Sequence, residues 1–531
     1  TGTSNVAVGS QSLEANTTAD YNTALGWNAG KLITTGEHNT LVGREAGQAG
    51  NLSQATLIGG AAGYAMTTAT ESVGVGYAAL LSTTTGSSNT AVGWFSMYAN
   101  TTGANNTAVG TSALDANTTA SNNTAVGHSA LGANTTGASN VAVGKDALDA
   151  NTTASSNIAV GYGALGAATT GGLNIGIGSY AGDAITTGSQ NTAMGYNALS
   201  ANITSHSNTA IGSGALSVNT AAQNTAVGDE ALNKNTTGTG VVAVGYNSLG
   251  ENTTGADNTA FGYNALDANT TASNNTAVGK EALGANTAAG NTAVGKDALA
   301  VNTTGANNVA VGWIAMTSNT TGANNIAVGR SALAANTTAG DNIAIGHIAL
   351  GSCTTGASNT AVGYTALTAS TTAGSNTAVG HRALTTNTTG AQNTAIGSQT
   401  GDLITTGSNN TCLGYQADPS GATASNEVTL GNSSVSSIRC QVQTISSLSD
   451  VRDKENIEEL PLGVEFINTL RPVKFDWAMR DGMQEGVQEI GFVAQELDKA
   501  QQDANAEEYM RLVLKTNPER LESTYGKLVP I

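Results

Sequence analysis

The sequence has few of the residues from which ordinary globular cores are built. Of its 531 residues, 4% are aromatic and 11% are charged, and all five prolines stand after residue 418. So little bulk argues against several conventional cores, and so few charges argue against a disordered polyelectrolyte. No apolar run reaches the roughly 20 residues of a membrane-spanning helix, so we expect no membrane insertion.

Basic residues and cysteines are also scarce. The net charge of −18 disfavours nucleic acid and anionic membrane surfaces as partners. The three cysteines, Cys353, Cys412 and Cys440, are scattered without CxxC spacing, and the five histidines are far apart. We therefore expect neither a disulfide framework nor a metal site. The sequence contains no phosphate-binding or calcium-repeat motif, so no cofactor is expected either.

Charge is spread unevenly along the chain. Residues 1–448 carry 9 Lys and Arg and 20 Asp and Glu, whereas the much shorter segment 449–531 carries 10 and 17. The composition therefore predicts two parts. We expect a repetitive shaft over residues 1–432, a connecting strand over 433–448 and a separate domain over 449–531.

Glycine is abundant, with 67 residues, and it marks a repeat. The glycine that ends each AVG-like triplet recurs 26 times from Gly9 to Gly431, and its period is 17 in all but three steps, which are one position shorter. The consensus is N-T-A-V-G-x-x-A-L-x-A-N-T-T-G-A-x. So strict a register indicates one structural unit stacked on the last. The segment NTAVG predicts a short strand and NTTGA a turn, while xxAL fits either a second short strand or one turn of helix.

Stacked in parallel, these units predict a mostly β protein whose residues 5–432 form a β-solenoid with one repeat per turn. Asparagines in register can satisfy each other's amides, as in other stacked ladders, so the Asn-Thr-Thr segments at Asn117, Asn134 and Asn151 are turn and ladder rather than glycosylation sites. So thin a structure buries little per chain, so a homotrimer is expected. One column should be buried, formed by Val109, Val126 and Val143. Another should be exposed or lie between chains, formed by Trp94, His128 and Lys145.

The position after each repeat glycine accepts aromatic and charged residues alike, which indicates an outward position. We name seven of its aromatic members the aromatic ridge and treat them as a candidate surface for a host glycan or protein receptor. The alternative is a permissive outward position without a ligand. The ridge comprises Trp27, Trp94, Tyr196, Tyr246, Tyr263, Trp313 and Tyr364.

The C-terminal part lacks the repeat and has a different pattern of apolar and charged residues. We expect a helix over about 461–470, strands over 473–477 and 489–493, and a helix from residue 494. Three blocks in order, SDVRDK, LRPVKFDW and GFVAQEL, resemble the peptidase S74 family, the intramolecular chaperone domains at the C-termini of phage tailspikes and tail fibres. The repeats more loosely resemble the head repeats of YadA-like trimeric adhesins.

The S74 resemblance implies a small α+β domain that trimerises, assists folding of the upstream β-structure and then cuts itself off. It implies Ser449 as nucleophile and Lys454 as general base, with Asp450 and Arg452 shaping the turn. A lysine kept neutral by desolvation can take a serine proton. We expect the cut at Leu448–Ser449, with Ser449–Asp450 as the alternative bond. Family members usually continue into a long bundling helix, which we expect to be missing here.

These features favour a trimeric structural or adhesive fibre, such as a phage tail fibre on a virion. A bacterial trimeric adhesin at a cell surface is the alternative. A tailspike depolymerase is disfavoured, because the repeats offer no pair of carboxylates at a plausible cleft. We therefore expect no enzyme directed at a substrate, beyond autoproteolysis by the Ser-Lys dyad.

Overall fold

The computed structural model describes residues 2–438, 454–478, 486, 488–515, 521–523 and 528. It divides the chain into two compact units, Thr1–Asp341 and Asn342–Ile531. The solenoid repeats fill the first unit and begin the second, and the helices belong to the second.

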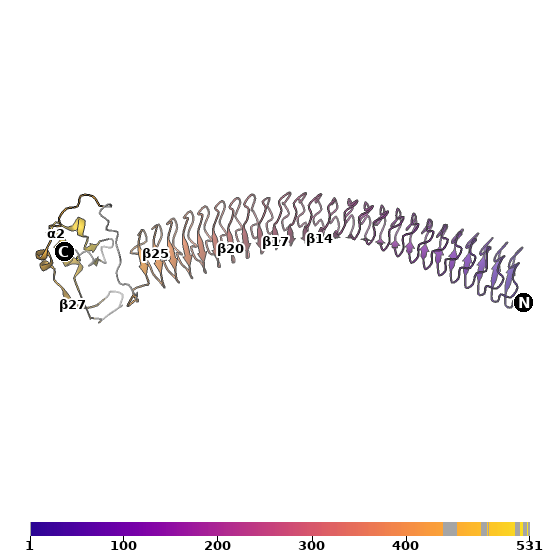
Figure 1. The fold of residues 1–531 in the computed structure, drawn as a ribbon, viewed down its shortest axis with the longest axis horizontal. Coiled ribbons are helices and arrows are strands. Elements are labelled where there is room, and N and C mark those ends of the chain that lie inside the picture. The colour runs from indigo at the N-terminus through magenta and orange to yellow at the C-terminus, as the bar shows by residue number, and fades with distance from the viewer. Residues whose placement is uncertain are drawn as a thin grey trace. The chain divides into compact units, whose positions relative to one another are not determined.

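The first unit is a parallel β-solenoid in which each repeat forms one turn (Figure 1). Thr107, Ala108 and Val109 pair in parallel with the corresponding residues of the next repeat. The strands are β1 (Val6–Val8), β2 (Thr23–Leu25), β3 (Thr40–Val42), β4 (Thr56–Ile58), β5 (Val73–Val75), β6 (Thr90–Val92), β7 (Thr107–Val109), β8 (Thr124–Val126), β9 (Val141–Val143), β10 (Ile158–Val160), β11 (Ile175–Ile177), β12 (Thr192–Met194), β13 (Thr209–Ile211), β14 (Thr225–Val227), β15 (Val242–Val244), β16 (Thr259–Phe261), β17 (Thr276–Val278), β18 (Thr292–Val294), β19 (Val309–Val311) and β20 (Ile326–Val328).

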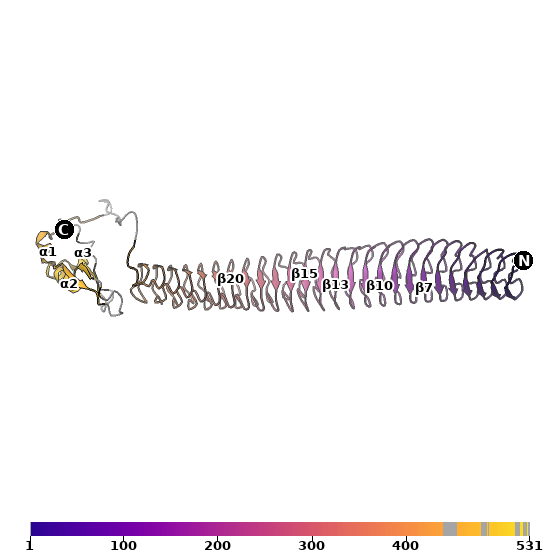
Figure 2. The same cartoon turned by 90° about the horizontal axis from the view of Figure 1, so that it is seen from below.

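The predicted parallel solenoid is thereby confirmed. A shortened step keeps the register, because Thr40 lies opposite Thr56 although this repeat is one position shorter than most. The position that the shorter repeat lacks therefore lies outside the strand. Figure 2 shows the short strands aligned on one side of successive turns, with the connecting loops completing each turn.

The interior is filled by small residues from the strands and by leucines from the opposite wall. The middle residue of each strand in this unit from β2 onward points inward, as Ala108 does, and Leu114 is buried from the other side. The predicted buried column of Val109, Val126 and Val143 is wrong. Val109 is 37% exposed and the other two are half-buried. Side chains alternate along a strand, so once the middle residue points inward, the first and third side chains face out.

The xxAL segment forms neither of the two structures that the sequence left open. It is a hydrogen-bonded turn in which Ser112 and Leu114 have left-handed backbones, with φ of 52° and 53°. The N–H of Leu114 donates to the carbonyl of Ala130 in the next turn at 3.0 Å. Because a neighbouring turn satisfies this backbone, no helix is needed to pair it.

Two buried asparagine ladders run along the turns, as predicted. In one, the side chain of Asn123 accepts from the backbone N–H of Asn140 at 2.9 Å and donates to the carbonyl of Gly137 at 3.0 Å. In the other, Asn134 donates to the side-chain oxygen of Asn117 at 3.1 Å. These amides are used inside the solenoid, which confirms the turn-and-ladder interpretation of Asn-Thr-Thr.

The repeat glycine occupies a backbone that other residues cannot adopt. Gly127 has φ of 138°, and a Cβ built on it would lie 2.4 Å from the carbonyl oxygen of Gly144. That region of backbone space is nearly exclusive to glycine. The strict recurrence of this glycine therefore reflects the close stacking of the turns.

The second unit begins with six further parallel turns and ends in a small α+β region. Its solenoid strands are β21 (Ile343–Ile345), β22 (Thr360–Val362), β23 (Thr377–Val379), β24 (Thr394–Ile396), β25 (Thr411–Leu413) and β26 (Val428–Leu430). The elements that follow are α1 (Val464–Thr469), β27 (Val473–Asp476), β28 (Gln488–Gly491), α2 (Ala494–Asp503), α3 (Glu507–Met510), β29 (Val513–Leu514) and β30 (Glu522–Ser523).

The predicted helices and strands of the C-terminal part are confirmed within a few residues. The domain boundaries at 432 and 448 stay predictions, since residues 439–448 lie outside the described part of the chain. Where the structure is described, it contains no helix long and apolar enough to cross a membrane.

Candidate functional site

The C-terminal α+β region has a small core between its helices and its last strands. Buried residues come from α1 (Phe466), α2 (Leu497), the neighbourhood of α3 (Ala506 and Met510) and the segment at Leu512–Val513. Leu462, Ile467 and Phe492 pack against this core, partly buried. The sequence accounts for this packing, because the spacing of Phe466, Ile467 and Leu470 puts three apolar side chains on one face of a short helix.

Two of the three motif blocks meet in this region. Residues 473–476 of the LRPVKFDW block pair antiparallel with residues 488–491, which lead into GFVAQEL. Arg471 contacts Glu496 through two guanidinium nitrogens and both carboxylate oxygens, with Nε to Oε2 at 3.0 Å. The hydrogen bond from Arg471 holds the pKa of Glu496 below its ordinary value. The pair ties the start of β27 to the first turn of α2.

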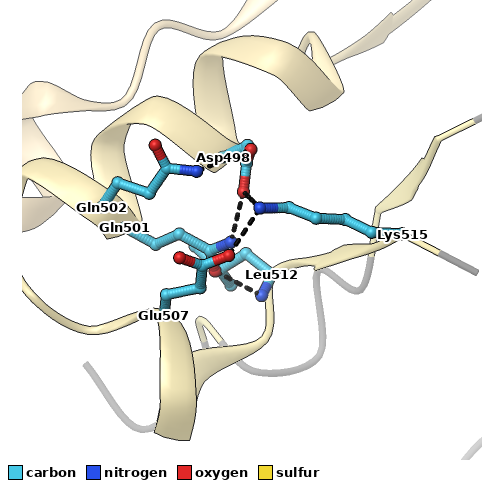
Figure 3. A network of polar contacts seen from close by, with 6 residues as sticks. All are labelled: Asp498, Gln501, Gln502, Glu507, Leu512 and Lys515. Atoms are coloured by element: carbon cyan, nitrogen blue, oxygen red, sulfur yellow. Dashed lines mark hydrogen bonds and ion pairs between the residues drawn. The ribbon is translucent and has the colours of Figure 1, made fainter. Parts of the chain in front are cut away.

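A polar network ties α2 to the segment that follows α3 (Figure 3). Gln501 is buried; it donates to Asp498 at 2.8 Å and accepts from the N–H of Leu512 at 2.8 Å. Lys515 reaches Asp498 at 2.7 Å and also contacts Glu507. Burial raises the pKa of Asp498, but hydrogen bonds from Lys515 and Gln501 outweigh it, so this pKa lies below its ordinary value.

This network was not identified from the sequence. The available signal was the position of Gln501 one turn after Leu497, which puts a polar side chain on the apolar stripe of α2. A buried amide needs partners for both its donor and its acceptor, and here it finds them in a carboxylate and a backbone N–H.

A cleft of about 920 Å³ opens between α1 and α2. Its floor includes Leu462, Phe466 and Ala500, and charged residues such as Lys499 and Asp503 stand on its lining. Apolar side chains beside it are exposed in the single chain: Val464 is 71% exposed. The cleft is therefore a concave surface lined by both apolar and charged side chains.

The predicted catalytic dyad is only partly within the described residues. Leu448, Ser449, Asp450 and Arg452 lie outside them. Lys454 is described and its residue is exposed in the single chain. The geometry of the dyad therefore stays a prediction. Among the described residues, no group of three or more His, Cys, Asp or Glu is arranged to hold a metal ion.

The aromatic ridge lies at the surface of the solenoid turns. Its seven members are 46% to 58% exposed, and the neighbouring His128 and Lys145 side chains are 57% and 55% exposed, as predicted for this column. Tyr246 stacks on Tyr263 with ring centroids 5.4 Å apart. Arg330 lies over the ring of Trp313 at 4.6 Å. The ridge is therefore a set of ordered, accessible rings.

Some solenoid carboxylates are partly buried. Asp115 and Asp149 stand two turns apart on either side of Gly132, where an added Cβ would lie 2.9 Å from Oδ1 of Asp149 and 3.8 Å from Oδ1 of Asp115. Burial raises the pKa of Asp115 and of Asp149. Burial likewise raises the pKa of Asp183. Folding should therefore favour the protonated form of these carboxylates.

Comparison with known proteins bears on the C-terminal part alone. No curated protein and no solved structure matches the chain. One family model does, over residues 449–505, and it is Peptidase_S74, described as the chaperone of endosialidase. The resemblance predicted from the three sequence blocks is thereby confirmed: behind a repeated parallel β-solenoid, the C-terminal segment matches the family of endosialidase chaperones.

Proposed function

We propose that this chain is the shaft of a homotrimeric fibre, such as a phage tail fibre or a similar surface appendage, and that its C-terminal domain assists assembly of the trimer. The observation that carries the proposal is the match of residues 449–505 to the endosialidase chaperone, C-terminal to 26 solenoid strands. A long parallel sheet of nonlocal pairings folds slowly and exposes edges while it does so. A domain dedicated to folding would counter both the slow folding and the exposure of sheet edges.

The outward face of the strands supports association between chains. Every strand from β1 to β26 ends in Val, Ile, Leu, Met or Phe, and none of these residues is buried in the single chain. We call these strand-ending residues the apolar column. A permissive outward position would collect charges, as the position after the repeat glycine does. Within each unit, an unbroken run of outward-facing apolar residues is typical of a surface that another chain covers.

Under the same proposal, the C-terminal domain carries out one reaction, the cleavage of its own chain at Ser449. The Oγ of Ser449 attacks the carbonyl carbon of Leu448 while the Nζ of Lys454 takes the hydroxyl proton. The Leu448–Ser449 peptide bond then breaks as its nitrogen gains a proton, which leaves an ester. Water hydrolyses the ester, restoring the Ser449 hydroxyl and releasing the domain. Lys454 is exposed in the single chain, so the proposal requires the assembled trimer to desolvate it.

The test uses the full natural chain with Ser449→Ala and Lys454→Ala variants. Denaturing gels should show two fragments for the unchanged chain and one full-length band for each variant. Light scattering should give three times the chain mass for each variant and three times the mass of the shaft fragment for the cleaved, unchanged chain, because assembly needs the trimeric surface and not the hydroxyl. Equal processing of Ser449→Ala and the unchanged chain would refute the dyad. A monomeric mass for the folded protein would refute the fibre.

Adhesion is the second part of the proposal, and the exposure of the aromatic ridge favours it. Ordered rings in water lose little conformational entropy on binding and offer large contact areas. A bacterial trimeric adhesin would use the same physics as a phage fibre. The genes beside this one distinguish the two, since neighbouring tail or baseplate genes indicate a phage.

A further inference from the structure

Two successive turns of the solenoid concentrate aromatic rings beyond the pattern of the ridge. Phe95 is the centre of the group: its ring centroid lies 4.3 Å from that of Trp94, 5.0 Å from that of Tyr98 and 5.8 Å from that of Tyr77. We call these four residues the aromatic patch. Trp94 is 53% exposed, Tyr77 51% and Tyr98 40%.

The rings of the patch do not serve the interior of the solenoid. Beneath them the core is complete, since Ala91 and Met97 are fully buried there. Elsewhere along the ridge, rings meet in pairs or short stacks, as Tyr246 does with Tyr263. A cluster of mutually packed rings that stays in water has the composition and rigidity of a binding hot spot.

The surroundings of the patch decide which ligand it fits. Between positions 46 and 114 Glu71 is the only charged residue, and Asp115, one turn on from Tyr98, is half-buried, so an ionic partner would find few groups to pair with. Thr111 and Ser112 follow Trp94 and Phe95 one turn on, and the N–H of Ser112 donates to the carbonyl of Trp94 at 2.9 Å. Aromatic faces beside hydroxyl groups suit a ring that has apolar C–H faces and hydroxyl edges.

We propose that the aromatic patch binds a neutral saccharide, with pyranose C–H faces on the exposed rings and sugar hydroxyls bonded to the hydroxyls of the next turn. The proposal rests on the proposed function, and it deepens that function by assigning a ligand class and a position to the adhesive surface. It commits to one occupant: a charged glycan, a protein or a second copy of this chain would each contradict it.

The test measures binding of the full chain to immobilised maltohexaose, cellohexaose and chitohexaose, with sialyllactose as the charged comparison. The patch variant carries Trp94→Ala and Phe95→Ala, and the matched control carries Tyr21→Ala and His38→Ala, a stacked pair of rings outside both the ridge and the patch. We expect the unchanged chain to bind at least one neutral oligosaccharide. The patch variant should bind it at least about tenfold more weakly, and the control should match the unchanged chain.

Three results would overturn the saccharide proposal: no neutral oligosaccharide bound, sialyllactose bound in preference, or equal loss in patch and control variants. Light scattering and thermal melting of the same samples complete the test. A lower mass or melting temperature for the patch variant alone would assign the patch to a second copy instead, which also contradicts the proposal. Failure of the fibre itself is seen separately, as a monomeric mass of the unchanged chain.

Discussion

Charging the apolar column should dissociate the fibre while leaving each solenoid turn folded. The perturbation replaces five consecutive members by lysine: Val109, Val126, Val143, Val160 and Ile177. Val109 is 37% exposed, and full burial of such a side chain is worth about 1.5–3 kcal/mol. The part still to be gained between chains is therefore roughly 0.5–1 kcal/mol per residue. Five residues account for about 3–5 kcal/mol per chain, or roughly two to four powers of ten in an association constant.

The control places the same five charges on the same turns at loop positions, Thr102, Thr119, Thr136, Thr153 and Thr170. All five are exposed in the single chain. Light scattering at micromolar concentration gives the mass, and circular dichroism reports the β-structure. We expect a trimer for the control and monomers with retained β-structure for the column variant. A trimeric column variant, or equal dissociation of both, would refute the assignment of the column to an interface.

The remaining predictions concern stability. Gly127→Ala should destabilise its turn by at least about 1–3 kcal/mol, because φ is 138° and the new Cβ meets backbone; Gly60→Ala, which meets only a side chain at 3.4 Å, should melt normally. Asn123→Ala leaves the buried N–H of Asn140 unpaired, while the carbonyl of Gly137 keeps its bond from Asn134, and local hydrogen exchange should show a loss of about 1–3 kcal/mol. Burial raises the pKa of Asp149, so the folded solenoid holds its proton more tightly and should gain stability as pH falls from 7 to about 4. Despite its burial, Asp498 has a pKa lowered by Lys515 and Gln501, so the C-terminal region should instead lose stability below about pH 4. Melting curves at several pH values should therefore differ between the two regions. The same pH response in both would contradict the predictions for Asp149 and Asp498.

The repeat alone predicted the parallel solenoid, its register and its asparagine ladders. A fixed period leaves few ways to satisfy the backbone, and the residues of NTTGA indicated which part of the repeat is a turn. The face of the strand was harder to assign. Val109 looked like core because it is the larger apolar residue, yet Ala108 is the one that fits between the sheet and the Leu114 wall. The larger apolar side chain, Val109, therefore faces outward, which a ranking of residues by hydrophobicity does not predict.

The conformation of xxAL and the C-terminal network depended on contacts that no local pattern encodes. Leu114 adopts a left-handed backbone because its N–H finds a partner in the next turn, and single residues carry no sign of that pairing. Gln501 is buried because Asp498 and Leu512 converge on it. The three motif blocks, by contrast, were sufficient to identify the chaperone family. The dyad and the ridge's ligand stay predictions.

The register kept across full-length and shortened repeats has a consequence for how such a protein changes over generations. Each strand bonds only to its immediate neighbours, as Thr40 does to Thr56 and Thr107 does to Thr124. Where the DNA that encodes neighbouring repeats is alike, unequal recombination adds or removes whole units. Each event would lengthen or shorten the structure by about 4.8 Å and leave every remaining contact as it was. The length of the solenoid, and so its reach toward a distant target, can then change over generations in small steps that do not alter the fold.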